Sequence, residues 1–281
     1  MPHLFVDNLT VIDCSVLDPE RGLIGASWIV DIELFGELDQ QSMVFDFGHI
    51  KKKIKQIIDN EVDHKLVIPD KFKGTNIDTN SLNNTVQVSF NDLKDGEIQH
   101  VSPSDALCLV ASNSITHEII IEHLKKIIQP ELPSNVEGLE LHLHQEDAYG
   151  FYYCYSHGLK KHNGNCQRIA HGHRSKIEIW ENNDRSRTWE QFWSNTLTDI
   201  YIGSKSDIKE TCESRTRFAY DAPQGHFEIE LDNNRVHLIN TDSTVECIAD
   251  HIAKQIKSNH PSSQIKVKAY EGVKKGAIAS Y

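Results

Sequence analysis

The feature that most constrains the fold of this chain is an internal duplication, with a period near half of its 281 residues. Two segments, at about 115–128 and about 244–257, have the apolar spacing of amphipathic helices. Thr116-His117-Glu118 aligns with Thr244-Val245-Glu246, and each helix leads into a strand of alternating apolar residues. The repeat predicts two similar units, each built from a strand pair, helices and a returning strand.

Each unit opens with a predicted β-hairpin, the second of which runs from Tyr152 to Trp180. Ile24-Gly25-Ala26-Ser27 in the first hairpin aligns with His171-Gly172-His173-Arg174 in the second. In this alignment Ser15 stands at the position of His157, and apolar residues replace the two later histidines. The two hairpins therefore share a pattern, but only the second carries histidines at these positions.

The second hairpin is a candidate metal site. His171 and His173 are two residues apart on an extended strand, so their side chains project from the same face. His157 ends the partner strand, which brings a third imidazole to the same point, and Cys166 lies in the loop beside them. Three nitrogen donors with a fourth position left open suit a catalytic zinc ion.

The composition is that of an ordinary globular protein, with 38% hydrophobic and 25% charged residues. A net charge of -12 argues against a nucleic acid or an anionic membrane as a general partner. The first residues show no leader pattern, and no apolar run approaches the roughly 20 residues that span a bilayer. Six cysteines without paired spacing predict reduced thiols, and together these features predict a cytoplasmic enzyme.

A second candidate element follows a helix predicted at 50–58 from the spacing of its isoleucines. Asp63-His64 lies just past this helix, and Phe45-Asp46-Phe47, before it, is predicted to end a strand. An isolated Asp-His dipeptide carries little information by itself. The C-terminal unit has no such pair at the corresponding place, because Asp250-His251 lies inside a predicted helix and is interpreted as a surface pair.

The order His157, Cys166, His171-Gly172-His173 resembles the zinc and nucleophile signature of the 6-pyruvoyltetrahydropterin synthase and 6-carboxytetrahydropterin synthase family, which has the T-fold. The segment 45–66 is similar to the family pattern FDF…LK…DHK.L. In that pattern the Asp-His pair completes the catalytic site. The resemblance is clearest over the two hairpins and this segment.

The resemblance implies an α+β fold of two tandem T-fold units, each of ββααββ type, with antiparallel sheets and helices on one face. The N-terminal unit, 1–148, keeps Asp63-His64 and has lost the metal site; the C-terminal unit, 149–281, holds the zinc site. In the family the active site lies between subunits, with the zinc and the cysteine on one and the Asp-His pair on its neighbour. We therefore expect each unit to supply one side of a shared interface.

The resemblance also implies catalytic roles. His157, His171 and His173 are the expected zinc ligands. Cys166 is expected to act as a general base in its thiolate form, and His64, oriented by Asp63, to relay protons.

The substrate-binding residues are expected at the ends of the later strands and in the zinc loop. The alternation of the last strand continues to Glu271, where the family anchors the pterin ring through a carboxylate. The first unit has Gln145 at this place and is expected to lack a pterin pocket of its own. Arg168 and Arg174 are candidate contacts to the triphosphate, although solvated loop charges explain them equally well.

The implied substrate is 7,8-dihydroneopterin triphosphate. The short loop between Cys166 and His171 favours the 6-carboxytetrahydropterin synthase of the queuosine pathway, with the pyruvoyl-forming reaction as the alternative. A non-catalytic pterin-binding or scaffold protein is a further alternative. The retained Cys166 and Asp63-His64 argue against it, because a protein that only binds pterin needs neither.

The expected assembly is a homo-oligomer, such as a trimer of two-unit chains, because T-fold barrels close by joining sheets from several subunits. Two regions remain hard to interpret. Residues 67–110 are rich in loop-forming residues around a strand at 85–90, and 181–235 offer an aromatic element at 189–193 and a strand at 227–231.

Overall fold

The computed structural model describes residues 3–37, 47–79, 85–94, 96–147 and 149–281. The N-terminal half forms a five-stranded sheet in the order β7-β3-β1-β2-β8. Its elements are β1 (His3–Asp18), β2 (Gly22–Gly36), α1 (Phe47–Glu61), β3 (Leu66–Pro69), β7 (Leu107–Val110), α2 (His117–Ile128) and β8 (Val136–His144). Neighbouring strands are antiparallel except at the β1–β3 and β3–β7 pairs, which are parallel.

The C-terminal half repeats this plan in a seven-stranded sheet, in which β11 pairs with β10 beside the order β16-β12-β9-β10-β17-β18. Its elements are β9 (Phe151–His157), β10 (His171–Glu181), β11 (Asp184–Arg185), α3 (Arg187–Leu197), β12 (Ile200–Ser204), β16 (Val236–Ile239), α4 (Val245–Asn259), β17 (Ile265–Tyr270) and β18 (Gly276–Ser280). The structure thus confirms two tandem α+β units of similar construction.

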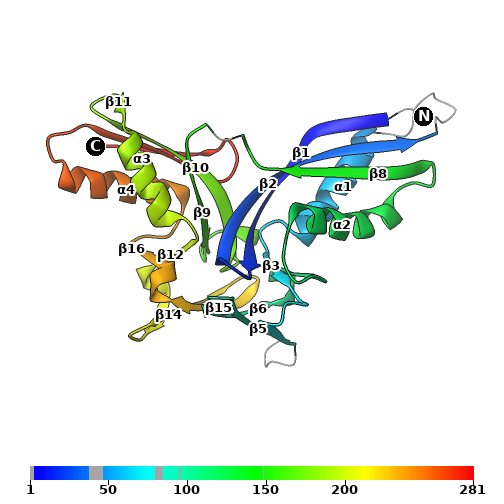
Figure 1. The fold of residues 1–281 in the computed structure, drawn as a ribbon, viewed down its shortest axis with the longest axis horizontal. Coiled ribbons are helices and arrows are strands. Elements are labelled where there is room, and N and C mark those ends of the chain that lie inside the picture. Colours follow the sequence, from blue (N-terminus) through cyan, green and yellow to red (C-terminus); the bar gives the residue numbers. More distant parts are fainter. Residues whose placement is uncertain (1–2, 38–46, 80–84, 95, 148) are drawn as a thin grey trace.

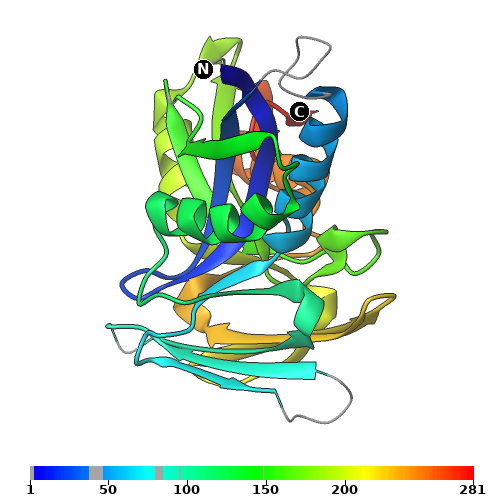
Figure 2. The ribbon, with the colours of Figure 1, turned by 90° about the vertical axis from the view of Figure 1, so that its right-hand side faces the viewer.

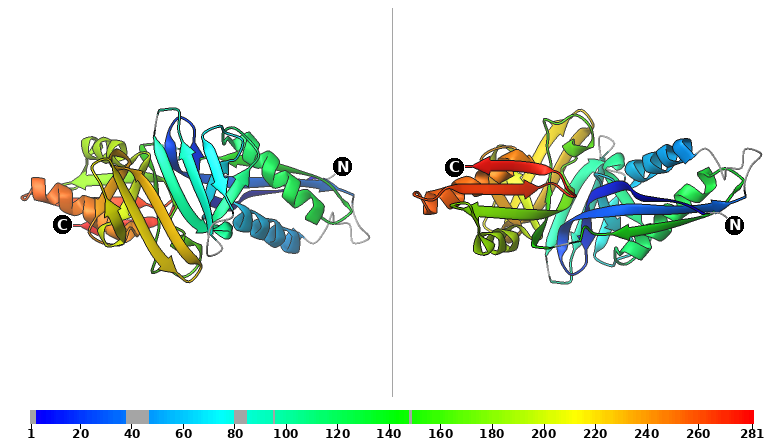
Figure 3. Two further views of the ribbon diagram at one scale, coloured as in Figure 1. Left: turned by 90° about the horizontal axis from the view of Figure 1, so that it is seen from below. Right: turned by 90° about the horizontal axis from the view of Figure 1, so that it is seen from above.

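A third sheet joins the two halves. Each half inserts three strands, and these form one six-stranded sheet in the order β13-β14-β15-β6-β5-β4. The strands are β4 (Thr75–Asp78), β5 (Thr85–Asn91), β6 (Glu97–Pro103), β13 (Ile208–Thr211), β14 (Arg215–Ala222) and β15 (Gly225–Asp232). Figure 1 shows this sheet below the two arms of the molecule, and Figure 2 shows it as a separate layer. Its cyan and gold halves lie side by side when seen from below (Figure 3, left).

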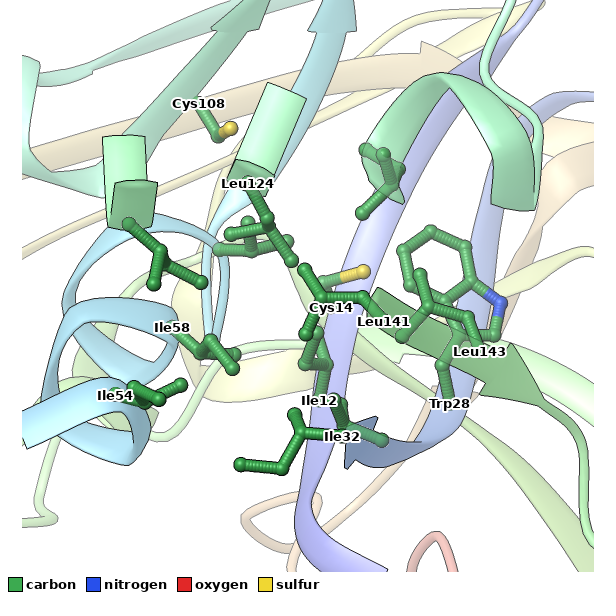
Figure 4. Packing of buried hydrophobic residues seen from close by; sticks show 14 of the residues in the cluster. Ile12, Cys14, Trp28, Ile32, Ile54, Ile58, Cys108, Leu124, Leu141 and Leu143 are labelled. Carbon is green, nitrogen blue, oxygen red and sulfur yellow. The ribbon is translucent and has the colours of Figure 1, made fainter. Parts of the chain in front are cut away.

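Two helices cover one face of each half-sheet. In the N-terminal half, isoleucines of α1 and apolar residues of α2 are buried against the strands (Figure 4), among them Ile54, Ile58 and Leu124. Burying one such side chain contributes roughly 1.5–3 kcal/mol, so the helices and the sheet stabilise one another. None of the helices in the described part of the chain has the length and apolarity needed to cross a membrane.

The ends of the helices support the alignment of the two halves. Thr116 caps α2 by accepting a hydrogen bond from the amide of Ile119, and Thr244 caps α4 in the same way from the amide of Cys247. The prediction that Phe47 ends a strand is wrong, because Phe47 is the first residue of α1. Phe45 and Asp46 lie outside the described residues.

The two opening hairpins meet at the junction of the halves, where β2 lies against β9 and β10. Gly25 and Gly172 face each other, and the Ser15 hydroxyl donates a hydrogen bond of 2.7 Å to the Ser156 hydroxyl. Ser15 pairs with Gly25 as Ser156 pairs with Gly172. The residue that corresponds to Ser15 is therefore Ser156.

His157 consequently corresponds to Val16, and the alignment of Ser15 with His157 is wrong by one residue. The two hairpin loops differ in length, so counting residues back from the loop does not show which positions are equivalent. The equivalent positions are instead those that occupy the same place in the pairing register of each hairpin.

The close approach of the hairpins leads to a stability prediction. A Cβ atom on Gly25 would lie 2.0 Å from the carbonyl oxygen of Tyr155 and 2.6 Å from the amide nitrogen of His173. Because both are backbone atoms, neither can move away without separating the halves. We expect Gly25→Ala to lower the free energy of unfolding by at least about 1–3 kcal/mol, measured by chemical denaturation. An unchanged transition midpoint would contradict this packing.

Candidate active site

The three histidines of the second hairpin converge in the structure. His157 ends β9 and pairs directly with His171 at the start of β10, and His173 follows on the same face. The centroid of the His157 ring lies 4.4 Å from that of His171 and 5.2 Å from that of His173. All three side chains are buried, and one ligand atom of each lies within 4.8 Å of the others.

The free nitrogens of these histidines fit a metal ion. The Nδ1 atoms of His157 and His171 donate hydrogen bonds to the carbonyl oxygens of Ser243 (2.8 Å) and Arg168 (3.0 Å). A donating Nδ1 leaves the lone pair on Nε2, and the Nε2 atoms of all three histidines are buried without a partner. Burial holds the pKa of His157 and of His171 well below the usual range, so both are neutral donors. Neutral imidazoles of this kind are preferred ligands of zinc.

Asp13, on β1 of the other half, completes this arrangement, although no sequence pattern indicates it. Its carboxylate lies 3.2 Å from Nδ1 of His173 and also accepts a hydrogen bond from the Ser27 hydroxyl. Burial alone would raise the pKa of Asp13, but His173, Lys275 and Ser27 together lower it to about 2. The residue is only 3% exposed. A carboxylate behind a metal-binding histidine fixes the orientation of the ring and raises its basicity.

This contact predicts an effect of Asp13 on metal affinity. Asp13→Asn keeps the size of the side chain but removes its charge, so we expect zinc to bind about 10–100-fold more weakly. Competition with a chromogenic chelator measures the change. The matched control is Asp31→Asn on β2, which makes the same change at a carboxylate that contacts His144 and Asn8 instead of the metal-binding cluster. Equal affinity of Asp13→Asn and the wild-type protein would show that Asp13 does not act on the metal.

His64 reaches the same point from the N-terminal half. It follows α1 with a φ angle of 55°, and its amide donates to the carbonyl oxygen of Asp13 at 2.7 Å. The Asp63 carboxylate holds Nδ1 of His64 at 2.7 Å and accepts the amide of Asp13 at 2.8 Å. The ring centroid of His64 lies 5.2 Å from that of His171. One chain therefore brings together residues from both halves.

Cys166 lies on a short 3-10 turn, Asn165–Gln167, beside these rings. A ligand atom of His64, Cys166 and His171 each lies within 4.8 Å of the other two. Burial lowers the pKa of His64, but hydrogen bonds and charge from Asp63 and Cys166 outweigh it and raise the pKa to about 10. His64 is therefore positively charged at neutral pH in this arrangement.

Two of the predicted substrate-binding residues, Glu271 and Arg168, lie beside the histidine cluster. Glu271 directly follows β17, and its carboxylate lies 3.8 Å from Lys275, the lysine that also approaches Asp13. The Arg168 guanidinium donates a hydrogen bond of 3.4 Å to the carbonyl oxygen of His64. Both residues thus lie at the margin of the histidine cluster.

Arg174 lies apart from the three histidine rings, and its contact with substrate stays a prediction. Neighbouring residues of a strand face opposite sides, so Arg174 points away from the face that carries His173. Its guanidinium stacks 4.0 Å from the centroid of the Tyr152 ring and donates to the carbonyl oxygen of Glu146.

The corresponding place in the other hairpin has lost the metal-binding groups. Asp199 corresponds to His64, because it has a φ angle of 60° and its amide donates to the carbonyl oxygen of Cys154 at 2.7 Å. It forms an ion pair with Arg21 instead of facing imidazoles. A cavity of about 360 Å³ remains there, and its lining includes Ile24, Ala26, Trp28, Gln145 and Cys154. Ile24 and Ala26 replace two of the histidines, so this place cannot bind a metal as the other does.

Fold and site together define a chain of two T-fold units with a candidate metal centre at their junction. The family model described as 6-pyruvoyl tetrahydropterin synthase matches the chain twice, over residues 14–149 and 146–281. The chain belongs to this family of tetrahydropterin synthases. The two matches also confirm the tandem repeat.

Individual relatives are distant. A protein of Pyrococcus horikoshii, assigned as a 6-carboxy-5,6,7,8-tetrahydropterin synthase, is 23% identical over 122 residues, or 43% of this chain and 68% of the relative. A catalytic-residue mutant of Plasmodium vivax 6-pyruvoyltetrahydropterin synthase is 20% identical, with a TM-score of 0.40 over 51% of this chain and 90% of that one. The Plasmodium falciparum enzyme is 16% identical, with a TM-score of 0.41 over 50% and 90%.

Proposed function

We propose that this chain is a zinc-dependent 6-carboxytetrahydropterin synthase that acts on 7,8-dihydroneopterin triphosphate, in the pathway to queuosine. One observation carries the proposal: three unpartnered histidine nitrogens, a thiol and an Asp-His pair share one site, although the two halves of the chain contribute different members. A protein that only binds a pterin has no use for this combination.

His157, His171 and His173 would hold the zinc ion. Their ligand atoms are neutral nitrogens. Zinc prefers such ligands, whereas magnesium and calcium prefer oxygen ligands. Bound there, zinc would supply Lewis-acid polarisation of oxygen atoms on the substrate side chain. Asp13 and the carbonyl oxygens of Ser243 and Arg168 would keep the three rings in position.

Cys166 would remove a carbon-bound proton from the polarised side chain of the substrate. The charged imidazole of His64 would stabilise the thiolate before this step, and would then donate a proton to a substrate oxygen. Asp63 accepts a hydrogen bond from Nδ1 of His64, so it would leave Nε2 as the atom that exchanges protons.

Glu271 would bind the pterin ring, because a carboxylate can accept two hydrogen bonds from an amino group and an adjacent ring N–H. Arg168 would contact the triphosphate from its place beside His64. Its guanidinium is mostly buried, so an anion there would be screened little by water.

Product analysis tests the reaction. We expect the zinc-loaded protein to convert 7,8-dihydroneopterin triphosphate into 6-carboxytetrahydropterin, acetaldehyde and released triphosphate, detected by mass spectrometry. A 6-pyruvoyl product would instead support the alternative reaction. No product from a folded, zinc-loaded chain would favour the non-catalytic pterin-binding protein.

The oligomeric assembly, the cellular compartment and the boundary between the two units are also proposals. Strands β8 and β18 end their sheets, so they offer edges through which copies of the chain could join, as in the predicted trimer. All six cysteines are described and free, as in a reducing compartment such as the cytoplasm. We place the boundary of the two units between residues 148 and 149; residue 148 is outside the described residues.

A further inference from the structure

A second group of metal-binding side chains lies on the helix-covered side of the N-terminal half. Glu61 is the last residue of α1, Cys108 lies on the edge strand β7, and His123 lies in the middle of α2. One ligand atom of each lies within 4.8 Å of the other two. Figure 4 shows Cys108 at one end of the apolar cluster, near the helix that carries Leu124.

The spacing of the three ligand atoms is close to that around a zinc ion. The Cys108 sulfur lies 3.7 Å from Nε2 of His123 and 3.9 Å from Oε1 of Glu61, and those two atoms are 2.9 Å apart. A tetrahedral zinc ion with bonds of about 2.0–2.3 Å separates its ligand atoms by about 3.3–3.6 Å. Shifts of a few tenths of an ångström would therefore bring all three into coordination.

The site is also accessible. The Cys108 side chain is buried, but the Glu61 and His123 side chains are 32% and 19% exposed. A metal ion could enter from this side, and a water molecule could fill its fourth position. The three residues come from three different elements, so a metal ion would tie both helices to the edge of the sheet.

The C-terminal half has a corresponding position with fewer potential metal ligands. His237 on β16 and His251 on α4 occupy the positions that correspond to Cys108 and His123, with their Nε2 atoms 3.0 Å apart. No third residue completes a metal-binding group there among the described residues. The histidine pair is uncharged when each ring is neutral and offers only two ligand atoms, whereas Glu61, Cys108 and His123 offer three, one of them a carboxylate. At this place, among the described residues, the N-terminal half has a carboxylate and a thiol that suit a divalent cation, and the C-terminal half has neither.

We propose that Glu61, Cys108 and His123 form a second, structural metal site that takes zinc or a similar borderline-soft divalent cation. The thiolate and imidazole select such ions over magnesium and calcium, which prefer all-oxygen sites. This site is separate from the three-histidine site and does not depend on the reaction. Its ion stabilises the packing of α1 and α2 on the sheet.

The test is the zinc content of the untagged full-length chain after loading with excess zinc and desalting. We expect two zinc ions per chain in the wild-type protein. The double variant His157→Ala/His171→Ala removes the three-histidine site and should retain one. Adding Cys108→Ser should remove that ion, whereas the matched control, Cys212→Ser at an exposed thiol, should not. Zinc should also raise the melting temperature of the double variant only while Cys108 is present.

A second variant keeps the test decisive if Cys108→Ser fails to fold. Glu61→Gln preserves the shape of the side chain, and we expect it to lower zinc retention in the double variant, with an unchanged circular dichroism spectrum. Cobalt gives an independent readout, because a thiolate ligand produces a near-ultraviolet charge-transfer band that should require Cys108. A double variant that binds no zinc, or one whose zinc is unaffected by both Cys108→Ser and Glu61→Gln, would overturn the proposal.

Discussion

Cys166→Ala is expected to lower kcat by about 10²–10⁴-fold, the usual contribution of a positioned general base, while the chain keeps its zinc. The expected ligands are His157, His171 and His173, so the ion does not need the thiol. The candidate ligand atoms of Cys166, His64 and His171 nevertheless lie within 4.8 Å of one another, so a role of the thiol as a ligand has to be tested. Steady-state kinetics and the zinc content of the same sample measure the two parts of this prediction.

The control for this variant is Cys212→Ala, which removes an exposed thiol from a strand end and should leave kcat unchanged. Cys166→Ser gives a graded comparison, because a hydroxyl is a far weaker acid than a thiol and should restore little activity. Wild-type turnover in Cys166→Ala would remove the thiol from the reaction. A loss of zinc along with the activity would make Cys166 a ligand instead of a base.

His64→Ala is expected to cause a comparable fall in kcat, also about 10²–10⁴-fold, because it removes the proton donor and the cation beside the thiol. The pKa of His64 is raised to about 10, so the imidazole is protonated below that pH and loses its proton above it. Turnover should therefore decline as the pH rises through this value. The alkaline decline should be absent from the residual activity of His64→Ala.

The variant His64→Asn distinguishes a hydrogen-bonding role of His64 from a role in proton transfer. His64→Asn keeps a side chain that can accept and donate hydrogen bonds, but it carries no charge. We expect it to remain as inactive as His64→Ala, with zinc bound in both. An active His64→Asn variant, or an unchanged alkaline decline in His64→Ala, would contradict the assigned role.

The convergence of the three histidines could be predicted from the sequence because its geometry is local. His171 and His173 share a strand face by simple alternation, and one hairpin brings His157 to them. The Asp63-His64 pair was recognisable only through the family pattern, since nothing in its own spacing indicates proximity to a metal. The repeat itself followed from two amphipathic helices with matching caps.

The parts that could not be predicted all depend on long-range packing. In the sequence, Asp13 is a single polar residue within a predicted strand, with no sign of a special role. The contact of β1 with β10 is what places it behind His173. The third sheet depends on the pairing of β6 with β15, which are far apart in the sequence. Strand alternation places Arg174 on the face of β10 opposite to His173, which a count of basic residues near a loop does not show.

The central claim is that the two halves of a single chain build one active site, and subunit mixing tests it most directly. Cys166→Ala and His64→Ala chains, co-expressed with different tags and purified as mixed assemblies, each carry a defect in the site that they build alone. If His64 and Cys166 of the same chain act together, the mixture should turn over no faster than either variant by itself. Recovery of activity in the mixture would show that His64 serves a neighbouring chain, and would contradict a site made within one chain.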